Sequence, residues 1–131
     1  MIEVGQVLAT KNYPVDRALL LAYANASGDH NPIHQNEEFA LSVGLPNVIA
    51  HGMLTMALAG KYLSDIAGPA AVKEFSARFT KPVVVPADTT VLLEISGTVL
   101  SIEDSVAKID LTVICDGQKV LGNAKAQIVL A

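Results

Sequence analysis

The sequence predicts an α+β fold built around one antiparallel sheet, and three observations carry that prediction. The second half of the chain alternates apolar and polar residues over four successive segments, which is typical of strands with one buried face. The first half is rich in Ala and Leu and carries helix-capping signals instead. Where the halves meet, residues 52–59 are apolar on nearly every side of a helix, which predicts a buried helix. Helices followed by a run of strands are typical of α+β proteins.

Three helices are expected in the first half of the chain. Residues 14–27 are predicted to form the first, since Ala and Leu are frequent in them and Gly28 follows their end. Asn36 is expected to cap a short second helix, because two glutamates follow it directly and Gly44 comes soon after. The third helix is expected over residues 51–66, and its apolar first part makes it the buried one.

The strands are expected over residues 72–80, 89–100, 106–115 and 119–130, with a fifth over residues 7–13. Asp116-Gly117 is a hairpin signal, and Pro82 and Pro86 mark the connection between the first two strands of the second half. We predict that the four strands form an antiparallel meander. A long antiparallel sheet and one buried helix together predict a sheet that wraps around the helix, which is the hot-dog fold.

Length and composition narrow the classes of function. The 131 residues suit a single domain over residues 1–131, and a 51% hydrophobic content is enough for a core without disulfides or a metal. The formal net charge is −4 and the basic residues form no run, so neither nucleic acid nor a membrane is an expected partner. The N-terminal residues lack the pattern of a signal peptide and Cys115 is the lone cysteine, so a cytoplasmic location is expected.

Two short segments stand out in a chain that is otherwise rich in Val, Leu and Ala. They read Ser27-Gly28-Asp29-His30-Asn31-Pro32-Ile33-His34 and Ala50-His51-Gly52-Met53-Leu54. Asn31-Pro32 predicts a turn, because proline restricts its own φ and the conformation of the residue before it. Such a turn can bring the side chains of Asp29 and His34 within reach of one water molecule.

In these two segments the sequence resembles the MaoC-like (R)-specific enoyl hydratases, and the resemblance extends over nearly the whole chain. Within that family it is most similar to the beta subunit of mycobacterial-type (3R)-hydroxyacyl-ACP dehydratase, on residues 50–56 and 72–80. The resemblance implies a hot-dog fold and a hydro-lyase of fatty acid metabolism, which interconverts trans-2-enoyl and (3R)-3-hydroxyacyl thioesters of coenzyme A or an acyl carrier protein. It also implies a homodimer, or a heterodimer with a related hot-dog subunit.

The chemistry of that reaction gives roles to three residues. Water is a poor nucleophile, so a base must take its proton, and Asp29 and His34 are the candidate acid–base pair. Negative charge builds on the thioester oxygen as the enolate forms, and the N–H of Gly52 at the start of the buried helix is the candidate donor that stabilises it. A pair that acts on one face of the substrate predicts syn addition. No cofactor is expected, since hydration is redox-neutral.

The remaining residues of the two segments are expected to support the site. The supporting motif residues are Gly28, Asn31, Pro32 and His51. His51 is expected to orient the loop that holds Gly52, while Met53 and Arg78 are weaker candidates for substrate binding, the second through a phosphate of the pantetheine carrier. The three histidines match no helical pair of metal ligands, so no metal site is expected.

Two other functions remain open at this point. A hot-dog thioesterase would share the fold and the thioester, but would direct water at the carbonyl carbon, and the spacing of Asp29 and His34 around a turn argues against it. A substrate-binding or structural subunit of a heterodimeric dehydratase would not need to keep an intact pair. One departure from the family is Gly60, which stands where some members carry a serine near the active site.

Overall fold

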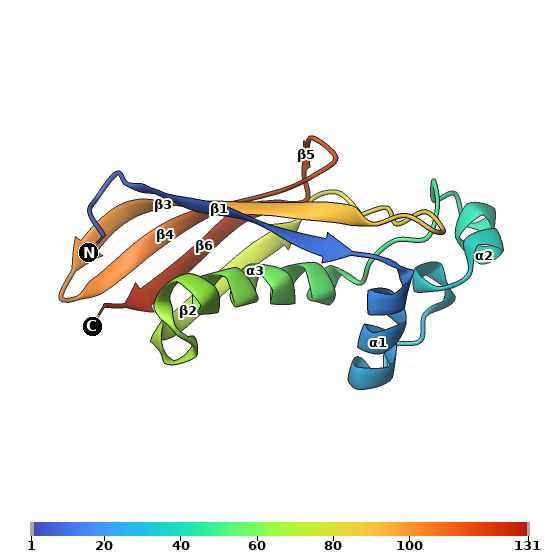
Figure 1. Cartoon of the computed structure of the whole chain (residues 1–131), viewed down its shortest axis with the longest axis horizontal. Helices are drawn as coiled ribbons and strands as arrows, with labels where there is room; N and C mark the ends of the chain where they lie inside the picture. The colour runs from blue at the N-terminus through green and yellow to red at the C-terminus, as the bar shows by residue number, and fades with distance from the viewer. Residues whose placement is uncertain (1, 131) are drawn as a thin grey trace.

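The computed structural model describes residues 2–130, which form one sheet with a long helix lying along it and two shorter helices beyond one of its ends (Figure 1). The strands are β1 (Val7–Val15), β2 (Val72–Phe79), β3 (Val91–Glu103), β4 (Val106–Cys115), β5 (Gln118–Lys119) and β6 (Leu121–Val129). The helices are α1 (Arg17–Ser27), α2 (Glu37–Ser42) and α3 (Gly52–Ala67), with short 3-10 turns η1 (Pro32–His34) and η2 (Pro69–Ala71). The predicted α+β class is therefore confirmed.

Capping interactions decide where α1 and α2 begin. The Asp16 side chain accepts a hydrogen bond of 2.8 Å from the N–H of Leu19, so Asp16 is the N-cap of α1. The prediction that this helix begins at residue 14 is wrong, because Pro14 still pairs with β3 as part of β1. Asn36 caps α2 through its side chain, as predicted.

A tight turn follows each of the two longest strands, β3 and β4. Asp104 and Ser105, between β3 and β4, have φ of 51° and 62°, and Asp116 and Gly117, between β4 and β5, have φ of 51° and 73°. Two successive residues with positive φ are typical of type I′ hairpin turns, whose twist matches that of the flanking strands. The hairpin predicted from Asp116-Gly117 is confirmed.

The position of β2 differs from the prediction. The order of strands in the sheet is β1-β3-β4-β6-β2, so β2 pairs with β6 and not with β3. The predicted meander is wrong at this point, because β1 occupies the edge of β3 that β2 would need. The segment that joins β2 to β3 is tied to the segment before α3 by backbone bonds of 2.8 Å, from Ala50 N–H to the Val83 carbonyl and from Val85 N–H to the Val48 carbonyl. These bonds fix the start of α3 beside the end of β2.

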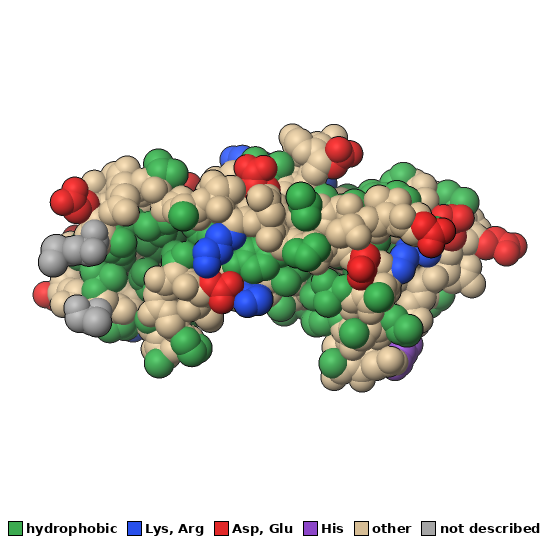
Figure 2. Space-filling model, in the orientation of Figure 1, with side chains coloured by type: hydrophobic (Ala, Val, Ile, Leu, Met, Phe, Trp, Pro, Cys, Tyr) green, Lys and Arg blue, Asp and Glu red, His purple; other side chains and the backbone are tan. Residues whose placement is uncertain are grey.

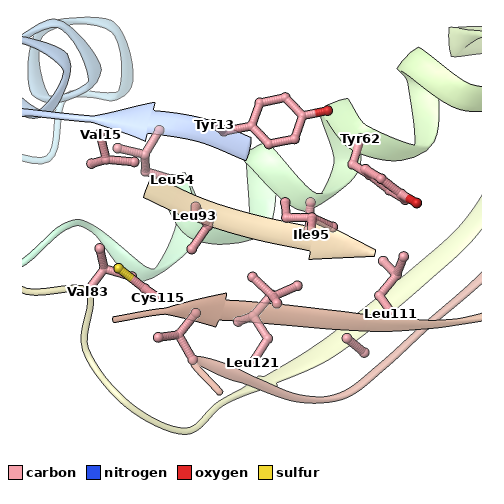
Figure 3. Close-up of a cluster of buried hydrophobic side chains, with 14 of the residues drawn as sticks. Tyr13, Val15, Leu54, Tyr62, Val83, Leu93, Ile95, Leu111, Cys115 and Leu121 are labelled. Atoms are coloured by element: carbon pink, nitrogen blue, oxygen red, sulfur yellow. The ribbon is translucent and has the colours of Figure 1, made fainter. Parts of the chain in front are cut away.

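Helix α3 packs against the sheet through one of its sides. Leu54 and Tyr62 of α3 belong to the same buried cluster as Leu93 and Ile95 of β3 (Figure 3). On the other side of the helix, Met53 is 57% exposed. The helix predicted to be buried is therefore buried on the side that faces the sheet, while its other side is exposed in the single chain, because one sheet covers only one side of a helix.

Tyr62 fastens α3 to β1. It is fully buried, and its hydroxyl donates a hydrogen bond of 2.8 Å to the carbonyl of Ala9. We expect Tyr62→Phe to lower the free energy of unfolding by about 1 kcal/mol, since the ring still packs but one hydrogen bond is lost. Urea denaturation measures this, with Leu63→Ala as a reference for a core cavity at about 2–5 kcal/mol. An unchanged unfolding midpoint in Tyr62→Phe would contradict the expectation.

The face shown in Figure 2 carries charges of both signs and no basic stripe. Within residues 2–130, no helix combines the length and the apolar character that crossing a bilayer requires. On the face shown in Figure 2, acidic and basic side chains are interspersed, and apolar side chains gather between the sheet and the helices. This pattern agrees with the modest negative charge of the chain.

Candidate active site

The loop after α1 holds the carboxylate of Asp29 in one orientation. Gly28 ends α1 with a left-handed φ of 80°. One carboxylate oxygen of Asp29 then accepts a hydrogen bond of 3.1 Å from the backbone N–H of Asn31, which is an Asx turn. Asp29 is exposed, so this turn, rather than burial, sets the direction of its side chain. Asn31, one of the predicted supporting residues, thus holds Asp29 through its backbone N–H.

The next turn carries His34 into the interior. The Asn31 side chain caps the single turn of η1 by accepting from the N–H of Ile33, and Pro32 occupies its first position. His34, at the end of this turn, is only 7% exposed. Its Nδ1 lies 2.8 Å from the carbonyl oxygen of Ile49. Because a carbonyl only accepts, Nδ1 carries the proton, and Nε2 of the neutral ring has a free lone pair.

The surroundings of His34 favour its neutral form. Burial lowers the pKa of His34 below its ordinary value of 6.5, and the nearby ring of His51 lowers it further. The hydrogen bond to Ile49 and the charge of Asp29 act in the opposite direction without reversing the shift. At neutral pH the imidazole is therefore uncharged and able to accept a proton at Nε2.

His51 connects the start of α3 to the loop that carries Asp29. It is 2% exposed, and its ring stacks on that of His34 with the ring centres 3.9 Å apart. Its Nε2 donates a hydrogen bond of 3.1 Å to the backbone carbonyl of Asp29. His51 also stands at the N-cap of α3 but makes no capping bond through its side chain. The hydrogen bond of His51 therefore orients the loop that carries Asp29. The prediction was that His51 orients the loop that holds Gly52.

The groups selected from the sequence converge in space. A carboxylate oxygen of Asp29, a ring nitrogen of His34 and a ring nitrogen of His51 all lie within 4.8 Å of one another. One water molecule can bridge groups at such a separation, because hydrogen bonds to water span about 2.7–3.2 Å each. The arrangement suits a pair that holds a water molecule and exchanges protons with it.

The same three residues are poorly arranged for a metal ion. The His34 and His51 rings are stacked with only 24° between their planes, and His51 has no nitrogen to offer, because its Nε2 is bonded to the Asp29 carbonyl and its Nδ1 is fully buried. Two imidazoles that share one metal must each point an in-plane lone pair at it, which nearly parallel stacked rings cannot do. The three residues are therefore arranged as hydrogen-bonding groups and not as metal ligands.

A cleft of about 300 Å³ opens beside this cluster. Its lining residues are His34, Ile49, Ala50, Gly52, Thr55, Phe79, Thr80, Lys81, Pro82, Val83 and Val120. Gly52 is the first residue of α3, and its N–H makes no hydrogen bond within the described part of the chain. Free N–H groups and the positive end of the helix dipole favour negative charge at such a position. The cleft thus brings an available donor together with the base candidate His34.

Two predicted substrate-binding residues do not line this cleft. Met53 follows Gly52 and points toward the exposed side of α3, since successive residues are rotated around a helix. Arg78 precedes Phe79, which does line the cleft, and neighbouring residues of a strand face opposite sides. The single chain therefore gives no support for substrate contacts by Met53 or Arg78.

Three groups in the cleft were not selected from the sequence. The Phe79 ring lies against Gly52 so closely that a Cβ built there would be 3.3 Å from two ring atoms. Thr55 could have been found by its position three residues after Gly52 on the same side of the helix. The carbonyl of Ile49 leaves no signature in the sequence, because every residue has one.

The fold and the site together define a class of protein, a hot-dog domain with an Asp/His cluster at the start of its long helix. The chain belongs to the MaoC-like family: residues 2–114 match the family model described as "MaoC like domain". A solved "MaoC-like dehydratase" superposes with a TM-score of 0.96 at 34% identity, over 99% of this chain and 41% of that one. The predicted hot-dog fold and family are confirmed.

Two further relatives carry names for a specific activity. The 3-hydroxyacyl-thioester dehydratase X of Mycobacterium tuberculosis is 49% identical over 72 residues, which are 53% of this chain and 24% of that protein. The solved R-hydratase PhaJ1 from Pseudomonas aeruginosa has a TM-score of 0.86 at 28% identity, and the match covers 98% of this chain and 82% of that one. The chain spans about a quarter of the length of the curated relatives that it matches first.

Proposed function

We propose that this chain is a hydro-lyase that interconverts trans-2-enoyl and (3R)-3-hydroxyacyl thioesters in fatty acid metabolism. The observation that carries the proposal is the convergence of Asp29 and a neutral His34, together with the cleft that His34 and Gly52 both line. The names of the dehydratase and hydratase relatives support it. The acyl group would be carried by coenzyme A or by an acyl carrier protein.

In the hydration direction, the Asp29–His34 pair would hold the attacking water. Nε2 of His34 takes a proton from it while the water oxygen bonds to C3 of the enoyl group, and the double-bond electrons move toward C2 and the thioester oxygen. The N–H of Gly52 donates to that oxygen as its negative charge grows. The pair then returns a proton to C2 on the same face, so that addition is syn and one stereoisomer forms.

The assay that tests this proposal uses crotonyl-CoA with the purified chain. Hydration removes the enoyl absorbance without releasing a thiol, and the product is expected to be the (3R) isomer. Release of free thiol with an intact enoyl group would instead identify a thioesterase. Turnover that appears only after a related subunit is added would favour the binding-subunit alternative.

The low pKa of His34 predicts how the rate depends on pH. The base must be neutral to act, and the pKa of His34 lies below 6.5. We therefore expect kcat/KM for hydration to stay near its maximum from about pH 8 down to about 7.5, and to reach half of that maximum only below pH 6.5. The same direction of shift predicts that the contribution of His34 to stability is complete above pH 6.5 and declines as the solution is acidified. A rate that already halves near pH 7 would contradict this.

A second hot-dog subunit, identical or related, is proposed to cover the exposed side of α3. Met53 and Phe79 are 57% and 55% exposed, and both are near the start of α3. The outer edge of β2 has no strand partner among residues 2–130. Exposed apolar side chains and an open strand edge both favour association. Sedimentation of the isolated chain distinguishes a homodimer from a monomer of 13.7 kDa that awaits a different partner.

A further inference from the structure

Thr55 is a buried polar residue in the wall of the candidate cleft. Its exposure is 5%, and the other buried polar or charged residues of the described chain are His34 and His51. All three gather at the start of α3, in a protein whose core is otherwise apolar. Burying a hydroxyl costs free energy unless it finds a partner, so the position of Thr55 calls for an explanation.

The hydroxyl of Thr55 has no partner within residues 2–130. A threonine in a helix often bonds back to the carbonyl one turn earlier, but here the His51 carbonyl accepts from the backbone N–H groups of Leu54 and Thr55, at 3.0 and 3.2 Å. Within the described chain, the side-chain nitrogen or oxygen that is fully buried and has no hydrogen-bond partner is Nδ1 of His51. The Thr55 hydroxyl also lacks a partner but is not in this class, so it is not fully buried. Since Thr55 lines the cleft, its hydroxyl is available to a molecule bound there.

The position of Thr55 relative to Gly52 indicates which atom it would contact. The two residues are three apart on α3, so they lie on the same side of the helix, and helix side chains tilt toward the N-terminus. The hydroxyl of Thr55 and the N–H of Gly52 are therefore two donors on one wall of a cleft that is also lined by His34, whose Nε2 has a lone pair to offer. The reacting oxygen that needs donors is the thioester oxygen, while the attacking water needs acceptors.

We propose that the Thr55 hydroxyl donates a hydrogen bond to the thioester oxygen of the substrate, as the second donor beside the Gly52 N–H. This inference rests on the proposed hydratase function. The hydroxyl keeps its proton throughout, and its hydrogen bond strengthens as charge builds on the oxygen. Its loss should therefore lower kcat much more than it raises KM, by at least about tenfold toward the hundredfold typical of such donors.

The kinetic test compares substitutions of Thr55 in the full chain with crotonyl-CoA as substrate. Thr55→Val keeps the shape and removes the hydroxyl, Thr55→Ala removes it in a smaller side chain, and Thr55→Ser retains it. We expect kcat to fall in the first two and to stay within about threefold in the third, with little change in KM. Thr89→Val is the control and should leave kcat unchanged, because Thr89 lies outside this cleft and its hydroxyl is bonded to the Ala87 carbonyl.

A spectroscopic test separates a hydrogen bond to the substrate from a structural effect. Hydrogen bonds to the carbonyl of 2,4-hexadienoyl-CoA draw electrons toward the oxygen and move its absorbance to longer wavelength. In a background of Asp29→Asn, which is expected to stop turnover, adding Thr55→Val should reduce this shift and adding Thr55→Ser should keep it. A full shift together with unchanged kcat in Thr55→Val and Thr55→Ala overturns the role of Thr55 while leaving the hydratase proposal in place. If the unsubstituted chain neither hydrates crotonyl-CoA nor binds the dienoyl thioester, both proposals fail.

Discussion

Replacing His34 with alanine is expected to lower the hydration rate of an enoyl thioester by at least about a hundredfold, which is the usual contribution of a positioned general base. Nε2 of His34 carries the free lone pair of the cluster, because Nδ1 is hydrogen-bonded to the Ile49 carbonyl. His51 cannot replace it, since its Nε2 is committed to the Asp29 carbonyl and its Nδ1 is sealed. Initial rates with crotonyl-CoA measure the loss, and urea denaturation verifies that the variant is folded.

The carboxylate of the pair can be tested with less disturbance. Asp29→Asn should lower the rate to a similar degree, yet the asparagine oxygen can still accept the hydrogen bond from the Asn31 N–H that shapes the turn. His30→Ala is the matched control, because His30 is an exposed neighbour that makes no side-chain hydrogen bond within residues 2–130, and its rate should stay within about twofold. Rates equal to those of the unsubstituted chain in both His34→Ala and Asp29→Asn would end the proposal for the pair.

Features that depend on neighbouring residues could be predicted from the sequence. Asn36 caps its helix, Gly28 ends the one before it, and Asp116-Gly117 forms a hairpin, because each residue type favours that local backbone. The alternation of apolar and polar residues also predicted the strands, since it follows from having one face of the sheet buried. The error at the start of α1 has the same local origin, as Asp16 suits both a first turn and an N-cap.

Features that depend on distant partners could not be predicted. Alternation in β2 shows that it is a strand, but it does not say whether β3 or β6 pairs with it. That choice depends on β1, which is remote in sequence and occupies the free edge of β3 in the sheet. The exposure of one side of α3 could not be predicted either, because an apolar helix can be covered by its own sheet or by another chain.

In the candidate site, too, the local features could be predicted and those that depend on distant segments could not. The turn at Asn31-Pro32 made it reasonable to expect Asp29 and His34 near each other, because the spacing is local. The carbonyl that fixes the tautomer of His34 belongs to Ile49, and the ring that lies against Gly52 belongs to Phe79 at the end of β2. Both come from segments that only the folded chain brings to the loop, so residue types alone gave no indication of them.

Replacing Gly52 with proline is expected to lower kcat by about 10²–10³, because it deletes the proposed backbone donor to the thioester oxygen. The fold should tolerate this change. Proline is favoured at the first position of a helix, where the N–H has no partner within the helix. The preceding residue, His51, already has φ of −57° and ψ of 134°, which suits a residue before proline. Rates with crotonyl-CoA and the far-UV circular dichroism of the variant measure the two expectations.

Gly52→Ala separates the loss of the donor from crowding at the same place. Both substitutions add a Cβ that would lie 3.3 Å from the ring of Phe79, but alanine keeps its N–H. Phe79 is 55% exposed, so its ring has room to move aside, and we expect a much smaller loss of rate in Gly52→Ala. Equal losses in the two variants would attribute the effect to Phe79 instead of the N–H. A folded Gly52→Pro variant with an undiminished kcat would show that the thioester oxygen is stabilised elsewhere in the cleft.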